Sequence, residues 1–293
     1  MKSLLFSGVG TALITPFSDG KVDYAALKRL CAYQADRGAD ALIVCGTTGE
    51  APTLTAIEKL HVVATACEAV GGKIPVIAGT TTNDTTYSMR LSRLAVKEGA
   101  DGILAVTPYY NRPTAEGLLA HFKAIAETCE RPVLLYNIPL RACCEISDAV
   151  YDGLAGHPLI AGIKEASGSV SRAASLVASY GDDLPLYSGN DDLTLPILSV
   201  GGKGVISVAS NLFPAEMHIL CECWERGKVS ECLALYRDLL PLMHALFLET
   251  NPIPVKAAMA HLGFCSAEIR LPLTEAKPSS VERLVKAMKP LLG

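Results

Sequence analysis

One lysine stands where an amine could act as a nucleophile. Lys164 lies near the end of an apolar run, residues 159–166, whose side chains would hold it out of water. Burial disfavours the charged ammonium form, and a neutral amine can attack a carbonyl carbon to form a Schiff base. A lysine at the end of a strand can also simply extend into solvent. The nucleophile hypothesis therefore depends on which groups the rest of the chain places beside it.

Hydroxyl groups follow other short apolar runs. The turn at 46–50 holds Thr47 and Thr48 between glycines, so hydroxyls and backbone N–H groups could converge on a small carboxylate, although such turns also cap helices. Tyr136 ends another run and could act as a general acid or base, or be a core tyrosine with a satisfied hydroxyl. Arg141 follows five residues later, and its guanidinium could be solvated or could hold a carboxylate with two hydrogen bonds.

These residue types suit one kind of chemistry. Hydroxyls and one amine are sufficient to move protons around a covalent imine. That chemistry needs no metal, phosphate-binding loop or nicotinamide, so we expect no cofactor. The six histidines are scattered, and the cysteines lack the spacing of a zinc site, so no metal site is predicted.

Eight short β-rich runs must position these side chains. The segments between most pairs of runs carry helical periodicity, and continuous apolar runs are typical of parallel strands buried on both faces. This alternation predicts an α/β fold, a (β/α)8 TIM barrel, in preference to a doubly wound sheet. In such barrels the chemistry collects at the carboxyl ends of the strands. The eight runs are residues 9–16, 41–46, 75–80, 102–108, 132–137, 159–166, 184–190 and 204–210.

Helical patterns continue after the eighth run. A helix over 214–226 would close the barrel, and further patterns follow at 229–247, 254–262 and 280–292. We therefore predict a catalytic barrel over residues 1–226 and a C-terminal helical extension over 227–293. No Gly/Ser-rich linker separates them, so the extension should pack on the barrel.

Composition excludes several classes of protein. Half of the residues are hydrophobic and 19% are charged, which is typical of a compact enzyme and not of a disordered chain. The net charge of −4, with no basic run, argues against a nucleic-acid partner. No apolar stretch reaches the roughly 18 residues of a membrane helix. Gly8 and Gly10 interrupt the apolar patch at the N-terminus, so we expect no signal peptide.

The ten cysteines show no CxxC pattern. They are expected to be reduced thiols, mostly buried, of a cytoplasmic protein. Cys143 and Cys144 are the exceptions, because they lie beside the loop that carries Arg141 and could be reactive.

Together, these motifs resemble the dihydrodipicolinate synthase family, a branch of the N-acetylneuraminate lyase family of class I aldolases. The resemblance covers essentially the whole chain, and the order and spacing of the motifs carry it, since each motif alone is common. The matching segments are 46–50, 107–111, 136–139, Arg141, 162–166, 188–189, 204–207 and 251–256.

The resemblance implies a lyase that needs no cofactor beyond Lys164. The lysine would form an imine with pyruvate, and the derived enamine would add to L-aspartate-4-semialdehyde to give 4-hydroxy-tetrahydrodipicolinate, in lysine and diaminopimelate biosynthesis. Tyr136, Thr48 and Tyr110 would form a proton relay. Tyr110 would reach in from a neighbouring subunit of a homotetramer (a dimer of dimers) or a homodimer. The implied substrate-binding residues are Thr47, Thr48, Arg141, Gly189 and Ile206.

Two alternatives stay open. Arg141 is typical of the synthases and absent from the sialic acid lyases, but Leu140, Ala142 and Cys143 beside it replace residues that often carry hydroxyls. The chain could therefore be another pyruvate-dependent aldolase of the same family, acting on a sugar acid or another 2-oxo acid. It could also be a non-catalytic sensor that binds pyruvate.

The resemblance also bears on inhibition by L-lysine. Synthases that lysine inhibits typically carry a glutamate at the position of Tyr87 and a histidine at the position of Ala56 or Lys59. This chain has neither, so we expect little or no inhibition. The positions of this vestigial effector site are Ala51, Ala56, Lys59, Asn83, Tyr87 and Tyr109.

Overall fold

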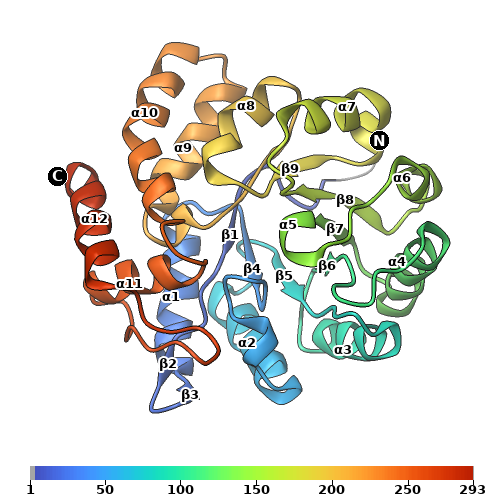
Figure 1. Cartoon of the computed structure of the whole chain (residues 1–293), viewed down its shortest axis with the longest axis horizontal. Coiled ribbons are helices and arrows are strands. Elements are labelled where there is room, and N and C mark those ends of the chain that lie inside the picture. The colour runs from blue at the N-terminus through green and yellow to red at the C-terminus, as the bar shows by residue number, and fades with distance from the viewer. Residues whose placement is uncertain (1–3, 293) are drawn as a thin grey trace.

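The structure is a computed structural model that describes residues 4–292. Eight parallel strands close into a barrel in the order β1-β10-β9-β8-β7-β6-β5-β4 (Figure 1). The predicted TIM barrel is confirmed, with every predicted run supplying one strand. Residues 1–3 of the N-terminal patch lie outside the described chain. The strands are β1 (Gly8–Ala12), β4 (Ala41–Val44), β5 (Val76–Gly79), β6 (Gly102–Val106), β7 (Val133–Asn137), β8 (Ile160–Glu165), β9 (Leu186–Ser188) and β10 (Gly204–Ser207).

Helices cover the outside of the barrel. Several begin at side-chain caps: Thr55 and Glu58 form a capping box at the start of α2, and Asp84 and Thr114 cap α3 and α4. The short helix α5 directly after β7 was not predicted. These helices are α1 (Tyr24–Asp36), α2 (Ala56–Val70), α3 (Thr85–Lys97), α4 (Ala115–Cys129), α5 (Pro139–Ala142), α6 (Asp148–Ala155), α7 (Val170–Tyr180), α8 (Thr194–Ser199) and α9 (Pro214–Glu225).

Three helices follow the barrel and lie together beside α1 and α9 in Figure 1. They are α10 (Val229–Ala245), α11 (Ile253–His261) and α12 (Pro278–Met288). Leu242, Met259 and Leu284 belong to the same hydrophobic core as the helices around the barrel. The division of the chain after residue 226 stays a prediction. None of the helices within residues 4–292 is long and apolar enough to span a membrane.

Two further features lie next to strand β1. A small antiparallel hairpin, β2 (Phe17–Ser18) and β3 (Lys21–Val22), follows β1 and was not predicted, because strands of two residues leave no periodic pattern. At barrel closure Gly204 has a φ of +153° and pairs with Gly8. A Cβ at Gly204 would collide with the Gly8 carbonyl, so only glycine fits there.

Candidate active site

The strand register places Lys164 between two tyrosines. Lys164 on β8 is level with Tyr136 on β7 and Tyr187 on β9. Residues level with one another on adjacent parallel strands point to the same side of the sheet, which here is the barrel interior. Lys164 is only 6% exposed and Tyr136 5%. The Lys164 Nζ lies 4.1 Å from the centroid of the Tyr136 ring.

Neither polar group is engaged elsewhere. Within residues 4–292 the Lys164 amine has no hydrogen bond or ion pair, and the Tyr136 hydroxyl has no hydrogen-bond partner. A buried lysine held for structure normally meets a carboxylate or carbonyl. The predicted roles of nucleophile and proton donor or acceptor require such free polar groups.

A cavity of about 440 Å³ opens beside this pair at the carboxyl ends of the strands. Thr47 contributes from the turn after β4, Tyr136 from β7, and Arg141 from α5. Tyr136, the neighbour of the predicted nucleophile Lys164, thus lines a space large enough for small substrates. The other lining residues are Cys45, Gly46, Ala51, Pro52, Leu54, Lys59, Gly79, Thr81, Thr82, Tyr87, Leu104, Val106, Tyr109, Ile138 and Ala142.

The threonine turn, residues 46–50, is held by a hydrogen bond from the segment that follows β1. Thr15 Oγ1 donates a 2.7 Å hydrogen bond to the Gly49 carbonyl. A Cβ on Gly49 would come within 3.2 Å of that same Thr15 oxygen, so a larger residue would crowd the segment that follows β1. Thr48 is buried, and its Oγ1 accepts a 3.0 Å hydrogen bond from Asn251 Nδ2. The Thr48 hydroxyl therefore keeps its own proton to donate.

A buried ion pair anchors the end of this turn. Glu50 Oε1 lies 2.6 Å from Lys256 Nζ on α11, and both side chains are 1% exposed. The second Glu50 oxygen accepts a 3.0 Å hydrogen bond from the Arg270 backbone N–H. Burial lowers the pKa of Lys256, while the Glu50 carboxylate opposes that shift. Because only Gly49 separates Glu50 from Thr48, the pair with Lys256 lets α11 fix where the turn ends.

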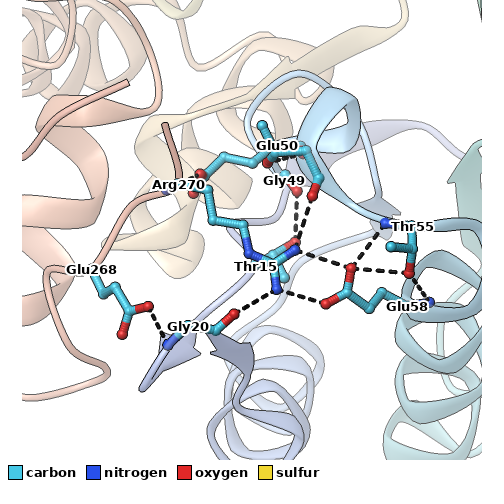
Figure 2. A network of polar contacts seen from close by, with 9 residues as sticks. Thr15, Gly20, Gly49, Glu50, Thr55, Glu58, Glu268 and Arg270 are labelled. Atoms are coloured by element: carbon cyan, nitrogen blue, oxygen red, sulfur yellow. Dashed lines mark hydrogen bonds and ion pairs between the residues drawn. The ribbon is translucent and has the colours of Figure 1, made fainter. Parts of the chain in front are cut away.

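The Arg270 side chain extends this anchor to α2. Figure 2 shows it reaching towards Glu58, and its Nη2 lies 2.6 Å from Glu58 Oε1. Hydrogen bonding to Arg270 is the main cause that lowers the pKa of Glu58 to about 2. The network thus ties the C-terminal segment to both the turn and the helix that follows it.

Asn251 connects two predicted site residues. Its side chain donates to Thr48, as described, and its backbone carbonyl accepts a 3.0 Å hydrogen bond from Arg141 Nη2. The Arg141 guanidinium is thereby oriented at the rim of the cavity, where the residue is exposed. Of the predicted site residues, Thr47, Tyr136 and Arg141 line the cavity. Thr48 and Lys164 are not lining residues, and they contact Asn251 and Tyr136 respectively.

The other predicted site residues lie apart from the cavity lining. Gly189 N–H donates to the Glu165 carbonyl at 2.7 Å, and a Cβ there would lie 2.6 Å from the Ala166 Cβ. Ile206 is buried in the barrel interior, in the same apolar cluster as Tyr136. Tyr110 is 90% exposed, so its own chain does not bring it to the site.

Four of the six predicted effector positions line the same cavity: Ala51, Lys59, Tyr87 and Tyr109. The Asn83 carbonyl accepts a hydrogen bond from Asn111 Nδ2 at 2.8 Å, and Ala56 begins α2. Burial lowers the pKa of Lys59, which is 5% exposed. Burial and the neighbouring Tyr87 raise the pKa of Tyr109.

Sequence reasoning missed the roles of Glu50, Asn251 and Lys256, which it treated only as parts of motifs. Lys256 did carry a signal, since it is a lone cation in the apolar segment of α11, as Lys164 is in β8. The predicted reactivity of Cys143 and Cys144 stays a prediction; Cys143 is exposed, and burial raises the pKa of Cys144.

Known proteins share this architecture along its whole length. The sequence profile of the Dihydrodipicolinate synthetase family matches residues 5–291. The chain is 43% identical over 285 residues to 4-hydroxy-tetrahydrodipicolinate synthase of Clostridium novyi, covering 97% of this chain and 96% of the relative. It is 46% identical to the Thermotoga neapolitana enzyme of the same name, covering 96% and 97%. The crystal structure of dihydrodipicolinate synthase from Aquifex aeolicus aligns with a TM-score of 0.95 at 43% identity, covering 98% of both chains.

We expect Lys256→Met to lower the free energy of unfolding by about 3–5 kcal/mol, because it leaves the Glu50 carboxylate buried and unpaired. Urea unfolding followed by circular dichroism measures this change. The double variant Glu50→Gln/Lys256→Met should recover part of the loss. Lys28→Met is the control, since it breaks an exposed pair with Glu68 and should cost no more than about 1 kcal/mol. A Lys256→Met variant as mild as this control would show that the ion pair is not an anchor.

Proposed function

Because the chain belongs to the dihydrodipicolinate synthetase family, we propose that it condenses pyruvate with L-aspartate-4-semialdehyde. The product is 4-hydroxy-tetrahydrodipicolinate, an intermediate of lysine and diaminopimelate biosynthesis, and the enzyme is a class I aldolase-type lyase. One observation carries the residue assignment: Lys164 is buried beside Tyr136, with no acidic partner in residues 4–292.

In the first half-reaction the Lys164 amine attacks the ketone carbon of pyruvate. Loss of water gives the imine, and loss of a C3 proton gives the enamine. Tyr136 exchanges protons with these intermediates, supported by its free hydroxyl beside the amine. Thr48 passes protons onward, because the Asn251 N–H occupies its acceptor side and leaves the hydroxyl proton to donate.

In the second half-reaction the enamine carbon bonds to the aldehyde carbon of aspartate semialdehyde. The amine of that substrate then attacks the imine carbon, closes the six-membered ring and releases Lys164. Thr47 and Thr48 hold the pyruvate carboxylate, with Gly189 and the Ile206 backbone shaping the pocket, and Arg141 holds the carboxylate of the second substrate. Its exposed position at the rim suits the substrate that enters last.

We also propose that a neighbouring copy of the chain completes the relay with Tyr110, in a homotetramer (a dimer of dimers) or a homodimer. The support is the contrast in exposure, since Tyr110 is 90% exposed whereas Thr48 and Tyr136 are buried. The covalent imine on Lys164 takes the place of a cofactor. The ten free thiols favour a cytoplasmic location.

The proposed activity is tested by incubating the protein with pyruvate and aspartate semialdehyde and identifying the product by mass spectrometry. We expect formation of the cyclic product that depends on both substrates. Turnover of pyruvate only with other aldehydes, which would give a sugar acid or another 2-oxo acid, would assign the chain to another pyruvate-dependent aldolase. Imine formation with no turnover by any aldehyde would make it a sensor.

Tyr136→Phe should lower kcat by about 100-fold, the scale of a positioned proton-transfer group, with a smaller effect on the KM for pyruvate. Steady-state kinetics measures both constants. Tyr180→Phe is the control, because it removes an exposed hydroxyl that donates to Asp152 and should leave kcat unchanged. A near-normal kcat for Tyr136→Phe would exclude Tyr136 from the relay.

Arg141→Ala should lower kcat/KM for aspartate semialdehyde by about 2–3 kcal/mol, the range for a hydrogen bond to a charged group. Imine formation with pyruvate should be unaffected. Arg131→Ala, another exposed arginine, serves as the control. Equal losses with both substrates would instead mean that Arg141 acts structurally, through its bond to Asn251.

L-Lysine should not inhibit with a half-point below about 1 mM, which corresponds to about −4 kcal/mol of binding. The reason is electrostatic: a cationic ligand would meet the Lys59 ammonium, and Tyr87 supplies no carboxylate. Inhibition curves at fixed substrate measure this, and Tyr87→Glu should increase sensitivity. Saturable inhibition of the unmodified enzyme below that concentration would show that other groups rebuild the site.

A further inference from the structure

Two aromatic rings fill the amino end of the barrel interior, and the proposed reaction does not use them. Phe6 lies just before β1, and its ring stacks on that of Tyr187 from β9, with the centroids 4.4 Å apart and the planes inclined by 22°. Tyr187 is fully buried, and its hydroxyl donates a hydrogen bond to the Phe6 backbone carbonyl. The Tyr187 ring is therefore fixed at both its face and its tip.

Gly10 on β1 leaves the space that the Phe6 ring occupies. A Cβ at Gly10 would lie only 2.9 Å from Phe6 Cζ, which is closer than carbon atoms in contact approach one another. Phe6, Tyr187 and Tyr136 belong to one buried apolar cluster inside the barrel, and Leu5 packs against it. The segment that precedes β1 thus supplies side chains to the barrel interior.

Tyr187 is also the neighbour of Lys164 in the barrel wall. The two residues are level on β9 and β8, and adjacent strands lie about 4.8 Å apart. Their side chains extend in opposite directions. The Tyr187 hydroxyl reaches Phe6 at the amino end, whereas the Lys164 amine lies over the ring of Tyr136, which lines the cavity at the carboxyl end. The stack of Phe6 on Tyr187 therefore lies on the side of Lys164 that faces away from the cavity.

The Tyr187 hydroxyl is unsuited to proton transfer. Burial raises its pKa, and the hydrogen bond to Phe6 opposes that shift only in part. Its proton is engaged with the Phe6 carbonyl. The hydroxyl therefore holds the ring in place, and any contribution of Tyr187 to the chemistry comes from where its ring lies.

We propose that Tyr187, held by Phe6, is a positioning residue for the imine that Lys164 forms with pyruvate. This inference rests on the proposed function of Lys164. The ring fills the interior on the amino-end side of the lysine, so the amine stays directed at Tyr136 and the cavity. It also keeps water from that side of the imine. Hydrolysis adds one water molecule across the imine bond and returns pyruvate and the amine, so the ring prolongs the life of the imine until the second substrate arrives.

Loss of the ring would admit water. In Tyr187→Leu the Phe6 carbonyl loses its hydrogen-bond partner and faces a vacated space, and a polar group beside a large enough cavity holds water. Phe6→Leu removes the stacked ring and leaves its carbonyl in place. Tyr187→Phe keeps both rings and removes only the hydroxyl.

The test follows the pyruvate imine alone, without the second substrate. The protein is equilibrated with pyruvate and diluted rapidly, and borohydride traps the remaining imine at successive times for mass spectrometry. We expect the imine to decay about tenfold faster or more in Tyr187→Leu and in Phe6→Leu, within the range for a displaced reacting group. Tyr187→Phe should decay at the parent's rate, because the ring is retained. If Tyr187→Leu does not fold, Phe6→Leu carries the same test from outside the strands.

Two variants control for a general loss of packing. Tyr151→Phe on α6 and Phe122→Leu on α4 alter buried aromatic residues of the core outside the barrel interior. Both should keep the parent's decay rate. Thermal unfolding followed by circular dichroism reports the Tm of every variant, so a change in stability is separated from a change in the imine.

The assignment is overturned if the imine decays in Tyr187→Leu and Phe6→Leu as it does in the parent, whatever their Tm. It is also overturned if Tyr187→Phe is as fast as Tyr187→Leu, since the hydroxyl and not the ring would then matter, or if the two controls show the same acceleration. A parent protein that forms no imine would contradict the proposed function itself, and this assignment with it.

Discussion

Burying an ammonium group costs free energy. The fold offsets that cost with an acidic partner or a bound ligand, or the amine loses its charge, and this constraint organises the site. The described chain buries three lysines: Lys59, Lys164 and Lys256. Lys256 has Glu50 at 2.6 Å and is structural. Lys164 has only the face of Tyr136, and Lys59 has no acid at all. Their different surroundings distinguish a structural anchor, Lys256, from the proposed nucleophile, Lys164.

The anchor matters because a barrel alone does not fix the loops at its rim. Glu50 and Lys256 are 206 residues apart in sequence, and their contact joins the turn after β4 to the C-terminal helices. Asn251, on the same C-terminal segment, bonds to both Thr48 and Arg141. Replacing such an ion pair with apolar residues could be neutral for stability, so its contribution is chiefly to geometry. The helices after the barrel thus position the two proposed substrate-binding regions relative to each other.

The barrel could be predicted because parallel strands that are buried on both faces consist of continuous apolar runs, which are visible in the local sequence. Each of the eight strands coincides with a predicted apolar run. The runs at 9–16 and 102–108 extend beyond the last residues of β1 and β6, because the residues at their ends are no longer part of the sheet. Lys164 was recognisable by the same local contrast. The pairing of Glu50 with Lys256 was not, since no periodicity encodes a contact over that separation. The hairpin β2–β3 and the four-residue helix α5 are too short to produce a pattern. Tyr110 could be associated with the site only by resemblance, because one chain leaves it in solvent.

The central claim is that Lys164 forms a covalent imine with pyruvate, and reductive trapping tests it most directly. The protein is treated with pyruvate and borohydride, digested, and mapped by mass spectrometry. The account predicts a reduced pyruvyl group on the peptide that contains Lys164, and none on the peptides that contain Lys59 or Lys256. An adduct on Lys59 in place of Lys164, or no adduct on protein that turns over pyruvate, would contradict it.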